Sequence, residues 1–362
     1  MGGVVSLLPN ACMGRDKKIL HDLKLTLPPE RVTSLLSLEH LNVNVPAWNS
    51  ELEIFWMKGL GFAKDTRADD VCSKVRAKGG SLQGLVWANA GLQQVHMPIG
   101  EPPPMESQTI PGFVGLAYSD IVGLRSNLKA LSIDFSLVSS QETVAMKDLG
   151  PPAMKVKSPT GVNFIIHGIR TSSWVTPSGW MNTKDLEEQQ VSLPSQVPSV
   201  CLGIPYMRFL CPHGKAAAVA RFYDCIFCTK AEVRKAANAE ECWVPVGASQ
   251  WIIYREAQAG DHIPYDGYHI AIYINNFVDT YRRAKERQLV WNNPRFPNTT
   301  YDTEDMAISH TEFRILKLVD PQSGEFICEL EHEIRAASHP AFCAKQWIGP
   351  KPLGELGDHQ GK

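Results

Sequence analysis

One arrangement of predicted elements recurs four times along this chain and constrains its fold more than any other feature. A short alternating strand opens each unit, near residues 40, 113, 206 and 269, and a helix and several further strands follow. The expected helices cover residues 50–60, 121–131, 215–228 and 277–287. A module of fixed order that recurs in this way indicates internal repetition, in which each unit buries its apolar face against its neighbours.

The opening strand of the fourth unit shows the pattern most clearly. Residues 268–274 alternate strictly, with isoleucine at 270, 272 and 274 and with His269, Ala271 and Tyr273 on the opposite face. Residues 37–46 alternate in the same way and place His40 opposite the leucine and valines. A period of two predicts strands with one buried face. We expect the apolar face to pack on the following helix and the histidines to face away from it.

The bulk composition excludes several classes of protein. A chain of 362 residues suits two domains of ordinary size, and 44% hydrophobic and 20% charged residues are typical of a globular protein. The net charge of -2 gives no reason to expect nucleic acid as a partner. The nine cysteines lack the spacing of a disulfide framework, so we expect reduced thiols and a cytoplasmic location.

The N-terminus carries a short pattern for lipid attachment. The first six residues, MGGVVS, fit the myristoylation motif at Gly2. One acyl chain binds membranes only weakly, and Cys12 offers a site for a second, palmitoyl chain. The hypothesis is a protein that is peripherally associated with a membrane through this segment; the alternative is an unmodified tail.

Changes in composition divide the chain into segments. Residues 1–36 are expected to form a flexible tail, and residues 37–170 a first domain of modules 1 and 2. A stretch rich in Ser, Pro, Thr and Gln at 171–199 predicts a linker. Residues 200–335 would form a second domain of modules 3 and 4, and residues 336–362 a C-terminal tail.

Several short motifs resemble the vicinal oxygen chelate superfamily, which includes glyoxalase I, extradiol dioxygenases and bleomycin-resistance proteins. The resemblance covers residues 37–335 and rests on the openings EHLNV at 39–43 and YHIAI at 268–272, and on the closing turns SPTGVN at 158–163 and DPQSGE at 320–325. It implies an α+β fold of four βαβββ modules, paired into two cup-shaped half-barrel domains, each with a cup that can hold a metal.

The resemblance places metal ligands on the first and last strands of paired modules, on faces that point into the cup. In the C-terminal cup it implies a metal site of His269, Glu329 and Gln250. Further cup residues there have expected catalytic roles: a base, an anion-binding cation and hydrogen-bond donors. They are Glu331, Arg208, Tyr206, Tyr254 and Tyr273.

The N-terminal cup offers an alternative site of His40, His96 and His167, with Phe113 at the position where the resemblance implies a further ligand. Imidazole and carboxylate ligands suit Fe, Zn, Ni or Mn, so we expect a divalent metal as cofactor. Each residue also has a plainer interpretation. A histidine on a strand face can be a hydrogen-bonded core residue, and Glu329 and Glu331 can be the solvated face of an edge strand.

Three functions remain open at this point. The favoured hypothesis is a metal-dependent enzyme of glyoxalase-like (lyase or isomerase) type, acting on a small, oxygenated, anionic molecule in the C-terminal cup. The second is an Fe(II) extradiol dioxygenase, disfavoured because Tyr206 stands where a histidine is expected. The third is a metal-free module that binds a small molecule. The sequence leaves open whether the chain is a monomer or a homodimer.

Overall fold

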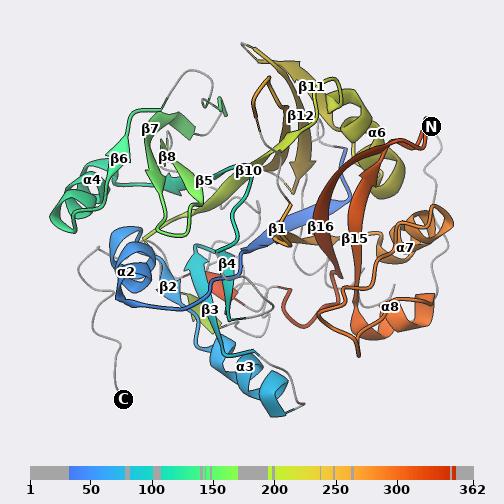
Figure 1. Ribbon diagram of the computed structural model, residues 1–362, viewed down its shortest axis with the longest axis horizontal. Helices are drawn as coiled ribbons and strands as arrows, with labels where there is room; N and C mark the ends of the chain where they lie inside the picture. The colour runs from blue at the N-terminus through green and yellow to red at the C-terminus, as the bar shows by residue number, and fades with distance from the viewer. Residues whose placement is uncertain are drawn as a thin grey trace, which may run out of the picture.

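The computed structural model describes residues 32–77, 82–100, 107–138, 142, 144–146, 149–169, 195–197, 200–236, 238–247, 249–261, 265–342 and 345–347. The predicted α+β class is confirmed: two large open sheets carry the helices on one face (Figure 1). Among the described residues there is no helix long and apolar enough to cross a membrane. The lipidation candidates Gly2 and Cys12 lie outside the described residues, and that hypothesis stays a prediction.

The first large sheet, here the outer-module sheet, combines strands of modules 1 and 4. Its strand order is β15-β16-β14-β1-β4-β3-β2. The strands are β1 (Leu35–Asn42), β2 (Ala63–Lys64), β3 (Gly84–Ala90), β4 (Gln93–Ile99), β14 (His269–Ile274), β15 (Glu312–Val319) and β16 (Phe326–Ala336).

The second large sheet, here the inner-module sheet, combines strands of modules 2 and 3 in the order β11-β12-β13-β10-β5-β8-β7-β6. The strands are β5 (Gly112–Tyr118), β6 (Phe135–Ser136), β7 (Leu149–Lys157), β8 (Asn163–Ile169), β10 (Gly203–Cys211), β11 (Glu232–Lys235), β12 (Glu240–Val246) and β13 (Gln250–Glu256). A separate parallel pair joins β9 (Ser195–Val197) to β17 (Lys345–Trp347).

The helices follow the opening strands as the sequence predicts. They are α2 (Ser50–Glu53), which continues as the π-helix η1 (Ile54–Gly59), then α3 (Arg67–Ala77), α4 (Ile121–Ala130), α6 (Ala216–Phe227), α7 (Phe277–Glu286) and α8 (Glu304–His310). Side-chain caps start several of them: the side chain of Asn49 accepts from Leu52 N, and that of Asp120 from Gly123 N. The predicted facing of β14 is confirmed, because Ile270, Ile272 and Ile274 join the core shared with the helices.

The pairing of modules differs from the expected one. Strand β1 pairs antiparallel with β14, with Leu41 opposite Ile270, and β10 pairs antiparallel with β5. Module 1 therefore shares a sheet with module 4, and module 2 with module 3, whereas the sequence interpretation paired 1 with 2 and 3 with 4. In Figure 1 the blue strand β1 accordingly lies beside the orange and red strands of module 4. The repeats present equivalent apolar faces, so periodicity alone does not specify the partner of each opening strand.

Gln250 links the two sheets to each other. Its amide nitrogen donates to Leu38 O (3.1 Å) and Ile204 O (2.9 Å), and its carbonyl oxygen accepts from Leu38 N (3.0 Å). The side chain is fully buried. Gln250 therefore holds β1 of the outer-module sheet against β10 of the inner-module sheet, and its amide is committed to backbone groups instead of a cup.

Strand β13 faces the opposite way from the sequence interpretation. Ile252 and Tyr254 lie in the core on the helix side, while Ile253 lies in the cup of the inner-module sheet. The run Trp-Ile-Ile-Tyr at 251–254 is apolar throughout, so its period gives no facing. The register in which Tyr206 pairs with Trp251 decides it.

Tyr254 belongs to a buried hydrogen-bonded chain between the sheets. The Tyr223 hydroxyl lies 2.9 Å from the Tyr254 hydroxyl and 2.6 Å from Nε2 of His332. Nδ1 of His332 donates to Leu330 O (2.8 Å), which leaves Nε2 as an acceptor for Tyr223. Burial lowers the pKa of His332 to about 4, so the ring is neutral near pH 7.

Replacing Gln250 with alanine should destabilise the fold without removing a metal ligand. The change leaves buried backbone groups of Leu38 and Ile204 without their partner, at a cost of about 2–4 kcal/mol. Thermal unfolding measures the loss, with Gln258→Ala, at a half-buried glutamine whose side chain donates to Asn238 O at the surface, as the control. A large loss of bound metal from a folded Gln250→Ala variant would instead support the ligand role expected from the sequence.

Acidification should weaken the fold partly through His332. Its pKa in the folded state lies below the ordinary value of 6.5, so the unfolded chain binds the proton first as the pH falls. Stability is therefore lost from about pH 6.5 down to about pH 4, by at most about 3 kcal/mol from this group. Urea unfolding at pH 7 and pH 4.5 should show a smaller difference for His332→Gln than for the unchanged protein. An equal pH dependence in both proteins would contradict the assignment.

Candidate metal centre

Three donor atoms from both ends of the chain converge on the cup face of the outer-module sheet. His40 comes from β1, His269 from β14 and Glu333 from β16. Nε2 of His40 lies 3.4 Å from Nε2 of His269, and Oε2 of Glu333 lies 3.2 Å from His269 Nε2 and 4.0 Å from His40 Nε2. Ligands about 2.1 Å from a shared ion lie roughly 3.0–3.5 Å apart, so this triangle is close to a coordination site.

A β-bulge aims His40 into this triangle. Leu38 pairs with Ile272 and His40 pairs with Ala271, so Glu39 is the extra residue of β1. The carboxylate of Glu39 accepts a hydrogen bond from Nδ1 of His40. With the proton on Nδ1, the Nε2 lone pair of His40 faces the other two donors, which is the arrangement that orients a metal-binding histidine.

His96 lies beside His40 but does not share its donor geometry. The two rings stack with centroids 3.7 Å apart and planes 21° apart, and Trp87 stacks on the other face of His96 at 4.5 Å. A ligand lone pair lies in the plane of its ring, so two stacked imidazoles cannot both point at one ion. Nε2 of His96 donates instead to Oε1 of Gln94 (2.9 Å). We therefore infer that His96 is not a ligand and that its ring supports the ring of His40 by stacking.

Glu331 and Glu333 of β16 are both buried, but only Glu333 belongs to the donor triangle. Glu331 is fully buried and accepts from Asn293 Nδ2 (3.0 and 3.2 Å) and from Arg314. Burial alone would raise its pKa, but His269, Arg314 and Arg295 hold the pKa of Glu331 below its ordinary value. Burial alone would also raise the pKa of Glu333, but the positive charges of Arg314 and Arg335 hold this pKa well below its usual range. Both groups are anions at neutral pH.

The structure groups the predicted ligands differently from the sequence interpretation. Within the described ranges, the sets of side chains close enough to share an ion are Glu39, His40 and His96, and His40, His269 and Glu333. Glu329 is in neither set and lies across from Lys317 of β15. Tyr273 is in the outer-module cup, where Arg335 Nη1 lies 3.3 Å from its hydroxyl. His40, His96 and His269, expected in two different cups, lie in one.

The inner-module cup is filled by its own side chains. Tyr206 hydrogen bonds to Nε2 of His167 (2.8 Å) and packs with Phe113, with ring centroids 6.1 Å apart. Arg208 lies over the Phe113 ring at 3.9 Å and pairs with Glu241 at 3.2 Å. His167, Tyr206 and Arg208 therefore lie together, away from the donor triangle. Apolar residues complete this cup: Ala117, Val144, Leu149, Ile165, Leu202, Trp243 and Ile253.

Sequence reasoning missed three charged residues of the site. Glu333 lies on the same face of β16 as Glu331, two residues further on, so the alternation of ELEHE at 329–333 already placed it in the cup. Arg335 continues the same alternation. Glu39 gave no such signal, because strict alternation puts it on the face opposite His40 and only the bulge turns it toward the site.

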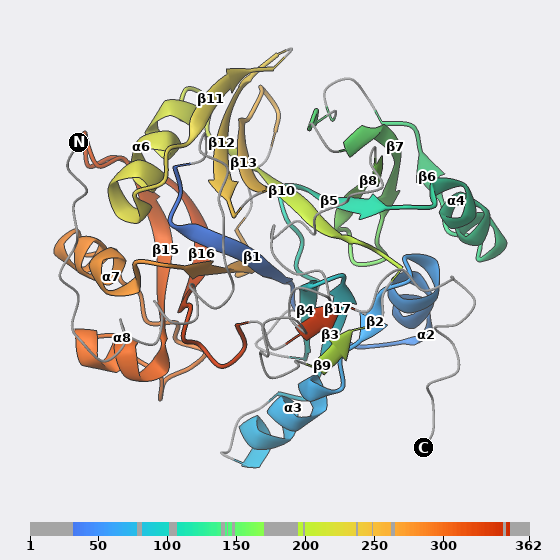
Figure 2. The ribbon, with the colours of Figure 1, turned by 180° about the vertical axis from the view of Figure 1, so that it is seen from behind.

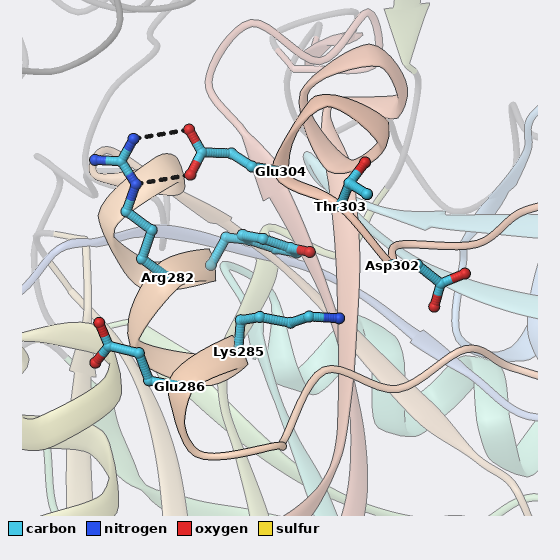
Figure 3. Close-up of a pocket in the computed structure, with 7 residues that line it drawn as sticks. Arg282, Lys285, Glu286, Asp302, Thr303 and Glu304 are labelled. Atoms are coloured by element: carbon cyan, nitrogen blue, oxygen red, sulfur yellow. Dashed lines mark hydrogen bonds and ion pairs between the residues drawn. The ribbon is translucent and has the colours of Figure 1, made fainter.

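A second hollow lies on the outside of the molecule, between α7 and α8 (Figure 3). Its volume is about 380 Å³, and Lys285, Asp302 and Thr303 are among the residues that line it. Arg282 and Glu304 form two hydrogen bonds there, of 2.7 and 2.8 Å. The charges of that pair satisfy each other, and no residue of the donor triangle reaches this hollow.

Comparison of structures identifies the fold. A proposed dioxygenase from Bacillus subtilis matches over 90% of this chain and 91% of its own, with 13% identity and a TM-score of 0.50. The chain has the fold of the vicinal oxygen chelate superfamily. Glyoxalase I from Zea mays matches over 84% of this chain and 93% of its own, with 11% identity and a TM-score of 0.47. No protein-family model and no curated protein matches the sequence.

Replacing Glu39 with glutamine should weaken metal binding without removing a ligand. The amide can present its nitrogen to His40 and no longer fixes the Nδ1–H tautomer, so we expect an affinity about 10–100-fold lower. Titration of metal-stripped protein with Zn²⁺ measures it, and Glu325→Gln, at an exposed carboxylate paired with Lys215, is the matched control. Equal affinities in the two variants would show that Glu39 has no part in orienting His40.

Proposed function

We propose that this chain is a metal-dependent enzyme whose site is the cup of the outer-module sheet, with His40, His269 and Glu333 as ligands. The observation that carries the proposal is the triangle of donor atoms, with edges of 3.2, 3.4 and 4.0 Å. Two imidazoles and one carboxylate on one face form the facial triad of non-haem iron oxygenases. The three donors lie on the cup face of the outer-module sheet, and cup faces are where the resemblance implies metal ligands.

The protonation state of His40 supports ligand binding. Burial lowers the pKa of His40 to about 4, although Glu39 acts in the opposite direction. The ring is therefore neutral near pH 7, as a metal-binding imidazole must be. The fixed Nδ1–H···Glu39 contact adds the orientation, so no proton has to leave His40 Nε2 before binding.

Among the reactions of this fold, we favour Fe(II)-dependent oxygenation of a small molecule with two adjacent oxygens. A triad leaves positions of the ion open, and when bound the iron would supply binding positions for both substrate oxygens and dioxygen. The glyoxalase-like alternative needs a free carboxylate that moves a proton. Glu331, the candidate from the sequence, is held by Asn293 and Arg314, which disfavours that role.

The protein groups around the triad have defined tasks in this proposal. Burial holds the pKa of Tyr273 well above its ordinary value, so its hydroxyl stays protonated and can donate a hydrogen bond to a substrate oxygen. Burial also lowers the pKa of His339 to about 4, so this imidazole, whose ring centroid lies 6.2 Å from that of Tyr273, is neutral near pH 7. The residues filling the inner-module cup make it the structural half of the molecule.

Metal analysis of paired variants tests the ligand set. His40→Asn, His269→Asn and Glu333→Gln should each lower iron content strongly, because each removes one of three ligands. His167→Asn and Glu329→Gln are the matched controls, since the structure places both outside the triangle. Unchanged protein that binds no divalent metal, or controls that lose as much metal as the three variants, would contradict the proposal.

Oxygen consumption separates the two reactions. Protein that is loaded with Fe(II) in the absence of air and then transferred to aerated buffer should consume dioxygen when catechol is added. Glu333→Gln should abolish this uptake. Zn²⁺-loaded protein should be inactive with catechol, because zinc has no redox chemistry. Isomerase activity on a hemithioacetal with Zn²⁺ or Ni²⁺, in the absence of oxygen uptake with iron, would favour the glyoxalase-like alternative.

A further inference from the structure

Two guanidinium groups flank Glu333, and they are bound to different extents. Arg314 is fully committed: its nitrogens donate to Glu312 (Nε, 3.1 Å), to Glu331 (Nη1) and to Glu333 (Nη2, 2.7 Å). This planar fork therefore holds three carboxylates of β15 and β16 in place. Arg314 has the contacts of a structural residue.

Arg335 has looser contacts. Its Nη2 pairs with Glu333, but its Nη1 lies 3.3 Å from both Glu39 Oε2 and the Tyr273 hydroxyl, at the long end of hydrogen-bonding distances. Its Nε is buried without a hydrogen-bond partner and lies 3.8 Å from Oε2 of Glu312, which is too far for a hydrogen bond. A buried N–H that is left unpaired costs free energy, so a ligand that accepts from it would be favoured.

The position of Arg335 is that of a substrate contact. It pairs with Tyr273 across β14 and β16, one step along the cup from the Ala271–Glu333 pair. Its side chain is 13% exposed, against 1% for His40 and 4% for Glu333, so it lies between the triad and solvent. The segment after β16 covers this end of the cup, where Phe342 packs on Tyr273 with ring centroids 4.6 Å apart.

The charges of the cluster point to an anionic ligand. Its carboxylates are Glu39, Glu312, Glu331 and Glu333, and its guanidiniums are Arg295, Arg314 and Arg335. The carboxylates exceed the guanidiniums by one, so a divalent cation in the triad would leave the loaded cluster positive. An uncompensated positive charge in a buried site is costly, and an anionic substrate offsets it.

We infer that Arg335 binds a carboxylate of the substrate, so that the substrate class is an acid carrying two adjacent hydroxyl oxygens. The inference rests on the proposed function and adds to it the residue that selects the substrate. A guanidinium fork matches a carboxylate in two parallel hydrogen bonds. The anion-binding role expected for Arg208 thus moves to Arg335, because Arg208 lies in the filled inner-module cup.

Binding of two matched probes to Fe(II)-loaded protein without air tests this inference. Catechol and 3,4-dihydroxybenzoate carry the same pair of hydroxyls, and only the second carries a carboxylate. Calorimetry should show the acid binding about 10–100-fold more tightly, the range of one charge-assisted contact. This ratio should fall toward one in Arg335→Met, be intermediate in Arg335→Lys and stay unchanged in the control Arg208→Met.

The outcomes separate this inference from the proposed function. If unchanged protein retains iron but binds both probes equally, or binds neither, the inference is wrong while the metal site stands. If the preference for the acid persists in both Arg335 variants, Arg335 does not provide it and the inference is also wrong. If unchanged protein retains no iron, the proposed function itself fails. Should Arg335→Met not fold, Arg335→Lys, which keeps the charge, decides the question.

Discussion

The antiparallel pairing of β1 with β14 is the contact on which the rest of the structure depends. It joins strands more than 200 residues apart, with Asn42 opposite His269 and His40 opposite Ala271. The pairing sets the distance between the two histidines, and the parallel partner β16 then brings Glu333 beside them. Figure 2 shows the same arrangement from behind, with β1 between the strands of module 4 and those of module 1. Gln250 secures β1 from the other side by binding both backbone groups of Leu38.

The two cups of this molecule use opposite solutions to burial. The inner-module cup is filled with aromatic and aliphatic side chains, which gain stability by leaving water. The outer-module cup buries carboxylates, guanidiniums and histidines. Burial removes the solvation of these charged groups, and the fold tolerates this cost only because nearly every charge is paired. Stability alone does not favour a cup that buries charged groups over one filled with apolar side chains. The contrast therefore supports the proposal of the outer-module cup as the functional site.

Much of the architecture was predictable because it rests on local periodicity. The alternation at 268–274 and at 37–46 gave the faces of His269 and His40 correctly, and the four-module order held. Pairing between modules was not predictable, since four similar apolar faces do not encode their partners. The bulge at Glu39 and the apolar run at 251–254 also escaped the sequence, because register with a neighbouring strand decides both. The expected ligands Gln250 and Glu329 therefore lie outside the triangle, whereas Glu333 was within reach of the alternation.

The origin of the three donors at opposite ends of the chain has a consequence for synthesis. A ribosome that has released modules 1, 2 and 3 has supplied every strand of the inner-module sheet, but only His40 of the triad. His269 and Glu333 follow in the last third of the chain. The closure of β1 on β14 spans a large loop, which is a slow kind of folding step. Until that closure, β1 lacks its antiparallel partner along one edge. The candidate metal centre is then the last part of the molecule to be completed, and a shortened chain would contain a folded sheet without the donor triangle.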